Sequence, residues 1–220
     1  LAGHQVPVIA LALAPDGVAR WSEAGDEALD AQVSAYVHAQ IAKDFARTLV
    51  TDPQTLAFID DVLPTFVNIN DECNAFYTRQ PVVEDGPRVG TINFFASSTT
   101  CENTSLLADV VYHEFGHGLH DHSVIEGVGL FDSAMSEGAS DFLAAIITED
   151  PGMGRGFFHD DEPLRHLDQA EGEATWPDDI GEVHQTGIIY GCAFWDLRKA
   201  AIAALGDDAG KSQDVLGRVY

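Results

Sequence analysis

The chain is poor in basic residues and has no long apolar run. Its 220 residues include 11 Lys and Arg against 36 Asp and Glu, a formal net charge of -25 at pH 7. Such a surface repels nucleic acid and anionic membranes, so we expect neither as a partner. The longest apolar run, residues 6–14, is shorter than the roughly 18 residues that span a bilayer, and it contains Pro7. The acid excess fits a solvated surface, bound cations or a salty environment.

An initiating Met and a signal peptide are also lacking. The chain starts at Leu1, which we interpret as a mature form cut from a precursor, or as a fragment. The remaining composition is ordinary for a globular protein, with 45% hydrophobic and 9% aromatic residues. A chain of this length can bury a core as one domain or as two small ones.

Residues 110–120 hold the pattern H-E-x-x-H, with His113, Glu114 and His117 as its fixed members. Residues four apart on a helix lie nearly one above the other, so the two imidazoles can face one metal ion. Glu114 would lie beside the metal, where a carboxylate can take a proton from a metal-bound water. The alternative is a solvated helix face that carries two histidines by chance.

A catalytic zinc site usually has three protein ligands and a water, so a third ligand is needed. One known arrangement places a histidine six residues after His117, behind a glycine turn, but Ser123 and His120 occupy those positions. A second acidic motif offers another solution, because Glu137 and Asp141 are four apart and share a helical face. Glu137 can ligate the metal while Asp141 accepts the outer N–H of a ligand histidine.

These motifs resemble those of the glutamate zincins of the thermolysin and fungalysin type. Residues 109–117 (DVVYHEFGH) are followed by Glu137 and Asp141 at the spacing of that family. Residues 74–77 (NAFY) resemble the edge strand that holds substrate in thermolysin-like enzymes. Residues 183–189 (VHQTGII) resemble the helix that carries their second catalytic histidine. The four motifs occur in the family's order over most of the chain.

The resemblance implies an α+β protein with the thermolysin-like zincin fold. An N-terminal mixed sheet and the active-site helix (residues 1–122) would face a mainly helical C-terminal part (residues 123–220). It also implies a secreted zinc endopeptidase that binds Zn²⁺ through His113, His117 and Glu137 and cleaves extended polypeptides. A propeptide or a further C-terminal segment would fit the same family.

The resemblance assigns further roles. Glu114 would be the general base, and His184 would donate a hydrogen bond to the tetrahedral oxyanion. Asp179, five residues before His184, matches the acid that orients this histidine. An extended substrate would pair with an edge strand at Asn74 and Ala75.

Two positions depart from the family pattern. Val128 stands where thermolysin-like enzymes have a tyrosine that helps to stabilise the oxyanion. Asp109 matches a calcium ligand, but Thr148, with Glu149 beside it, replaces the glutamate expected as its partner. A Ca²⁺ site is therefore left open.

Three cysteines are too few to define a disulfide framework. Cys73 and Cys101 are candidates for one bond in an extracellular setting, because both would lie near the sheet edge and the start of the active-site helix. Cys192 would then remain as a buried thiol on a helix.

Periodicity and turn residues predict the remaining elements. A polar loop over 98–104 should cap the active-site helix, and Asp132 or Ser133 should cap the second ligand helix. Gly116 and Gly118 cost roughly 1 kcal/mol each relative to Ala inside a helix, which indicates close backbone approach there. Residues 151–181 should be a long surface loop that forms a wall of the cleft. The other expected elements are a hairpin over 6–13 and 18–21, an amphipathic helix over 27–50, strands at 62–69, 74–78 and 89–96, helices at 105–120 and 134–149, and a helix at 184–205 with Ile188, Ile189, Ala193, Leu197, Ala201 and Ala204 inward.

Two other functions are possible for such a chain. A glutamate-zincin aminopeptidase should carry a Gly-x-Met-Glu-Asn strand that holds the free amine, and no such stretch occurs. The other candidate is a binding module whose zinc is structural or whose catalysis has lapsed. A structural zinc should be closed by four protein ligands, usually including cysteine, and the intact Glu114 argues against lapsed catalysis. None of the three cysteines lies beside the zinc-ligand motifs at residues 113–117 and 137–141.

Overall fold

In the computed structural model, residues 14–18, 21, 25–81, 88–124, 131–168 and 173–205 are described. The predicted hairpin lies mostly outside these residues, and so does Val128. Residues 14–18 form a turn in which Gly17 N donates to Ala14 O at 2.8 Å. None of the described helices is long and apolar enough to cross a membrane.

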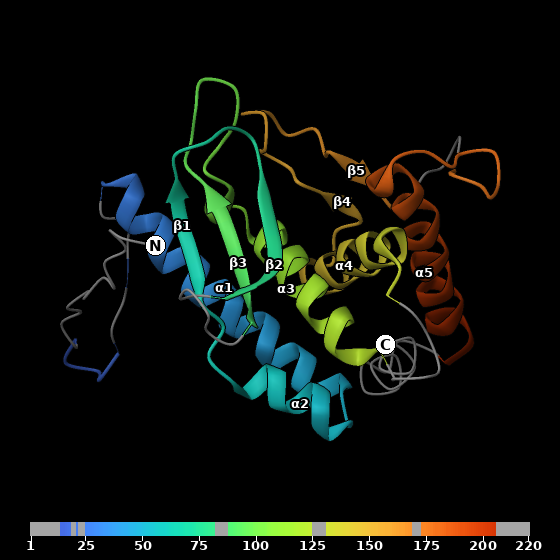
Figure 1. The fold of residues 1–220 in the computed structure, drawn as a ribbon, viewed down its shortest axis with the longest axis horizontal. Helices are drawn as coiled ribbons and strands as arrows, with labels where there is room; N and C mark the ends of the chain where they lie inside the picture. Colours follow the sequence, from blue (N-terminus) through green and yellow to red (C-terminus); the bar gives the residue numbers. More distant parts are fainter. Residues whose placement is uncertain are drawn as a thin grey trace.

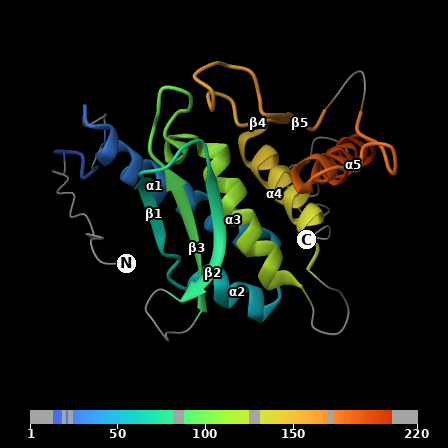
Figure 2. The ribbon, with the colours of Figure 1, turned by 45° about the horizontal axis from the view of Figure 1, so that its top comes forward.

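A small mixed sheet stands beside the helices that carry the motifs (Figures 1 and 2). The central strand β3 pairs in parallel with β1 and antiparallel with β2, which leaves β2 at an edge, as predicted. The strands are β1 (Thr65–Ile69), β2 (Ala75–Pro81) and β3 (Arg88–Phe95).

Helix α1 (Glu27–Leu49) confirms the predicted long helix. Asp26 caps it by accepting from the backbone N–H groups of the first turn. The buried stripe is made of small residues, whereas Tyr36 is 68% exposed. Alanines let the helix approach its neighbours closely, and they make up most of the buried face, which Lys43 and Leu49 complete. These buried alanines are Ala31, Ala35, Ala39, Ala42 and Ala46.

Helix α2 (Pro53–Asp60) was not predicted. Asp52 accepts from Thr55 N, and Pro53 fits the first helical turn, where a missing N–H costs nothing. The same residues that end α1 therefore start α2. The buried Lys43 joins the two helices, because its Nζ donates to Asp61 O at 2.6 Å.

Helices α3 (Ala108–Ser123) and α4 (Ser133–Thr148) are the two predicted motif helices, and they pack against each other (Figure 2). Asp132 caps α4 as predicted. The predicted side-chain cap of α3 is wrong: its N-cap, Leu107, makes no side-chain cap bond. A short 3-10 turn, η1 (Thr104–Leu106), precedes α3 and takes the polar cap instead, from Asn103.

Glycines set the spacing of these helices. A Cβ placed on Gly116 of α3 would lie 2.8 Å from the Cα of Ser140 on α4. A Cβ on Gly118 would lie 2.6 Å from the Phe58 ring. The predicted close backbone approach is therefore confirmed at Gly116, whereas at Gly118 the close neighbours are the side chains of Phe58 and Tyr77.

Helix α5 (Val183–Leu205) packs on α4, but its predicted inward face is wrong. Leu197 is 44% exposed, and Ala193 and Ala204 are exposed as well. Helix α5 contacts α4 through its glycines Gly187 and Gly191. The side of α5 that carries these small residues therefore faces inward. The buried residues are Thr186, Gly187, Gly191, Cys192 and Trp195.

The segment between α4 and α5 is more ordered than a plain loop. Strands β4 (Gly152–Met153) and β5 (Arg165–His166) form an antiparallel ribbon. Met153 and Leu167 are buried, which fixes the ribbon against the helices. The division of the chain into two parts at residue 122 stays a prediction.

Cys73 and Cys101 form a disulfide, and Cys192 is a free, buried cysteine. The bond joins Cys73, two residues before β2, to Cys101 in the loop before η1. It closes a loop across 28 positions of the sequence, which includes all of β2 and β3.

We expect the disulfide to stabilise the fold by about 3 to 4 kcal/mol, from the entropy of closing a loop of this length in the unfolded chain. The double variant Cys73→Ser/Cys101→Ser should lose that amount in urea unfolding. Reducing agent should destabilise the wild type equally and leave the variant unchanged. Equal stability of variant and wild type would contradict a bond between these two cysteines.

Candidate active site

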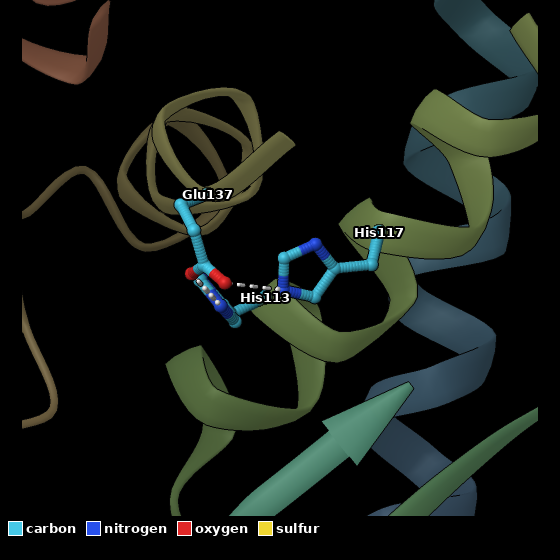
Figure 3. A group of neighbouring side chains, drawn as sticks. All are labelled: His113, His117 and Glu137. Atoms are coloured by element: carbon cyan, nitrogen blue, oxygen red, sulfur yellow. Dashed lines mark ion pairs between the residues drawn. The ribbon is translucent and has the colours of Figure 1, made fainter. Parts of the chain in front are cut away.

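His113 and His117 lie one turn apart on α3, and Glu137 faces them from α4 (Figure 3). His113 Nε2 is 3.2 Å from Glu137 Oε2, and His117 Nε2 is 3.6 Å from Glu137 Oε1. One ligand atom of each residue lies within 4.8 Å of the others. Within the described part of the chain, this is the one group of three His, Cys, Asp or Glu side chains close enough to share a metal.

The contacts within this cluster fit a cation. Glu137 Oε2 is buried and has no hydrogen-bond partner among the described residues, apart from the ion-pair contact with His113 Nε2 at 3.2 Å. Buried polar atoms are rarely left in this state. Two imidazole nitrogens and one carboxylate oxygen are the donor set of a catalytic zinc whose fourth position holds water. The residues therefore fit a metal ion such as Zn²⁺.

Each histidine is also held from behind by α4. His113 Nδ1 lies 2.7 Å from Asp141 Oδ1, the contact predicted for this acid. His117 Nδ1 lies 2.8 Å from Ser136 Oγ. Arg165 of β5 donates to both oxygens of Asp141, at 2.6 and 2.7 Å. Such partners fix the ring orientation and tautomer of a ligand histidine.

Sequence reasoning missed Ser136 and Arg165. A polar residue directly before Glu137 was the one available signal for Ser136. Arg165 comes from a segment without periodicity, so nothing local marked it.

The electrostatics favour a cation at the same point. Burial lowers the pKa of His113, but Asp141 and Glu137 outweigh burial and raise it to about 10. Burial raises the pKa of Glu137, but the neighbouring histidines, chiefly His113, lower it to about 2. The carboxylates that favour a proton on the His113 imidazole also favour a metal cation bound there in place of the proton. His117 has no carboxylate on its outer nitrogen, and burial lowers its pKa to about 3, which leaves it neutral as a ligand must be.

Glu114 lies next to the cluster in a cleft of about 410 Å³. It is 5% exposed, and its Oε2 has no hydrogen-bond partner among the described residues. Burial raises the pKa of its carboxyl to about 7, despite the lowering effect of His113. A carboxyl with this pKa can accept and return a proton near neutral pH.

The cleft is bounded by elements from both ends of the chain. Asn74, directly before β2, and Ala75, its first residue, line one side, and their role in holding substrate stays a prediction. The 151–181 segment contributes to another wall, as expected. The apolar lining consists of Val110, Met153, Phe157, Leu164 and Ile188, and the polar lining adds Arg165, Glu182, His184 and Gln185 to His113 and Glu114.

His184 reaches the cluster from α5, with its Nε2 3.6 Å from Glu137 Oε1. The predicted partner of His184 is wrong. Asp179 accepts from Thr175 N at 2.8 Å and from Thr175 Oγ1 at 3.3 Å, and so closes its own turn. The acid beside His184 Nδ1 is Glu182, at 2.9 Å.

Asp109, the candidate calcium ligand, is used within the fold. Its Oδ2 accepts from Gly154 N at 2.6 Å and its Oδ1 from Val110 N at 2.9 Å. Thr148 donates to Ala144 O within α4. The carboxylate of Asp109 thus ties the start of α3 to the β4–β5 ribbon, and calcium binding stays a prediction.

No protein-family model and no curated protein matches this chain. Among solved structures, it is similar to the precursor of protealysin, a metalloproteinase from Serratia proteamaculans, with a TM-score of 0.61 and 19% sequence identity. The match covers 90% of this chain and 66% of that one, so this chain spans less than two thirds of that structure's length. The likeness confirms the predicted thermolysin-like α+β fold.

We expect Ser136→Ala to weaken zinc binding about tenfold, because His117 loses the partner that fixes its ring. Competition with a chelator would measure this. Ser140→Ala is the matched control: Ser140 is equally buried on α4, but its Oγ has no partner among the described residues. Equal affinity of both variants would refute a role for Ser136 in holding His117.

Gly187→Ala should also weaken zinc binding about tenfold, or about 1.4 kcal/mol, within the usual cost of overpacking. The new methyl group would lie 2.6 Å from Glu137 Cβ and displace that ligand. Gly191→Ala, on the same helix, would meet Leu167 Cδ2 at 2.7 Å instead. It should lower stability and leave the zinc affinity unchanged. If the two variants bind zinc alike, α5 does not set the position of Glu137.

Proposed function

We propose that this chain is a secreted zinc endopeptidase that hydrolyses peptide bonds in extended polypeptides. One observation supports this most directly: His113, Glu114 and His184 line a single cleft, beside a cluster that fits a zinc ion. A ligand, a base and a hydrogen-bond donor thus face the same space. The chain's likeness in fold to a metalloproteinase precursor agrees with this reading.

The chemistry would divide between the metal and two side chains. Zn²⁺ held by His113, His117 and Glu137 would lower the pKa of a water and polarise the scissile carbonyl. Glu114 takes the proton of the attacking water and passes it to the leaving amine. His184 donates a hydrogen bond from Nε2 to the developing oxyanion, a role worth a few kcal/mol for comparable donors.

The substrate would lie antiparallel to β2. This strand pairs with β3 on one side, and its other side is free of strand partners among the described residues. An extended peptide can pair with such an edge through main-chain hydrogen bonds. Thr104 Oγ1 donates to Asn74 O at 3.0 Å and so fixes the start of the strand beside the cleft.

The Cys73–Cys101 disulfide supports secretion, because such bonds persist in oxidising compartments. A propeptide or a further C-terminal segment fits the proposal as well. The similar structure is a precursor, and this chain spans 66% of its length.

The second candidate function is a binding module with structural zinc or lapsed catalysis. A structural zinc is usually closed by four protein ligands. Here the cluster has three, and His113 opens on the cleft. The intact Glu114 also favours the enzyme.

Glu114→Gln tests the proposal. The variant should retain one zinc per chain by metal analysis and lose at least a hundredfold in casein cleavage, because the amide cannot accept the water proton. Glu149→Gln, an exposed change at the far end of α4, should cleave like the wild type. Cleavage unaffected by Glu114→Gln would rule out this base. Zinc binding without cleavage by the wild type would favour the binding module.

A further inference from the structure

Glu182 lies directly before α5, and its carboxylate has three contacts there. Oε2 accepts from His184 N at 3.0 Å, and Oε1 accepts from Gln185 N at 2.8 Å. Oε2 also lies 2.9 Å from His184 Nδ1. The hydrogen bond from His184 lowers the pKa of Glu182, so the carboxylate is ionised and Nδ1 is the donor.

These contacts hold the imidazole by a short chain of hydrogen bonds. The backbone N–H groups of the first turn of α5 fix the carboxylate as a helix cap. The fixed carboxylate then fixes the ring of His184, whose Nε2 points toward Glu137. The side chain of His184 is 50% exposed, so packing alone leaves it several rotamers.

We propose that Glu182 is the positioning residue that aims His184 at the oxyanion, in place of Asp179. This inference rests on the proposed peptidase function. The ion-pair partners of His184 within the described residues are Glu182 and Glu137, and Glu137 faces the other ring nitrogen. Asp179 is occupied by Thr175. Glu182 also lines the cleft, but its carboxylate contacts are with His184 and Gln185, so we infer that it acts through His184.

The oxyanion exists only in the transition state and in the tetrahedral intermediate. Loss of a group that aims its donor should therefore lower kcat and leave KM nearly unchanged. If Glu182 were only a helix cap, its loss would instead lower the stability of the fold and leave both kcat and KM unchanged.

Glu182→Ser separates the two roles. Serine caps a helix well, but its side chain is too short to reach Nδ1 of His184. We expect kcat on a peptide substrate to fall about tenfold, with KM within about twofold, because small errors of position are costly in catalysis. Asp26→Ser is the matched control, since the Asp26 side chain also caps a helix, α1, and does not line the cleft. Asp179→Asn should cleave like the wild type.

A double variant tests whether the effect runs through the histidine. In the His184→Ala background, Glu182→Ser should cause no further loss of kcat. Long-range ¹H–¹⁵N NMR of the imidazole gives a readout without turnover. It should show a protonated Nδ1 held in one ring orientation in the wild type, and averaging of the ring in Glu182→Ser.

The outcomes separate this inference from the function on which it rests. A wild type that binds zinc and cleaves nothing overturns both. An active wild type with kcat unchanged in Glu182→Ser overturns the positioning role alone. The same holds if Asp179→Asn lowers kcat and Glu182→Ser does not.

Discussion

The close packing of α4 between α3 and α5 is the constraint on which the site depends. Two imidazoles one turn apart can share an ion with a carboxylate only if the second helix comes almost into contact. Gly116 permits this on one side, where a Cβ would press on the backbone of Ser140. Gly187 permits it on the other, directly over Glu137. These glycines weaken their helices in isolation, and the packing that they allow offsets the cost.

The charges buried at this point are as unusual as the packing. Glu114, Glu137 and Asp141 are the only buried acids among the described residues, and all three belong to the site. Burying a carboxylate is costly unless a partner or a cation balances it. Arg165 balances one of the three charges, and a divalent cation would balance the other two. Stability alone gives no reason for such an excess, whereas metal binding and proton transfer do.

The parts of the site that could be predicted are those encoded by local spacing. His113, Glu114, His117, Glu137 and Asp141 follow from residues one or four apart on helices, where geometry is fixed by the backbone. Contacts between distant segments were not predictable in this way. Ser136 reaches His117, and Arg165 reaches Asp141, only after α4 and the β4–β5 ribbon have packed. The partner of His184 was wrongly predicted because the spacing of a family motif does not determine which groups hydrogen-bond within a turn. In this turn, Asp179 accepts hydrogen bonds from Thr175. The same limit explains the inward faces of α1 and α5: apolar periodicity located both helices, but small residues decided which side could approach a neighbour.

The acidic surface and the buried site are compatible for one reason. Every described acid outside the site is at least partly exposed, so repulsion among these acids is screened by water and salt. Their summed field still acts at long range and raises the local concentration of cations. A net charge of -25 therefore disfavours polyanionic partners and favours the arrival of a divalent ion at a cleft whose own excess charge is negative.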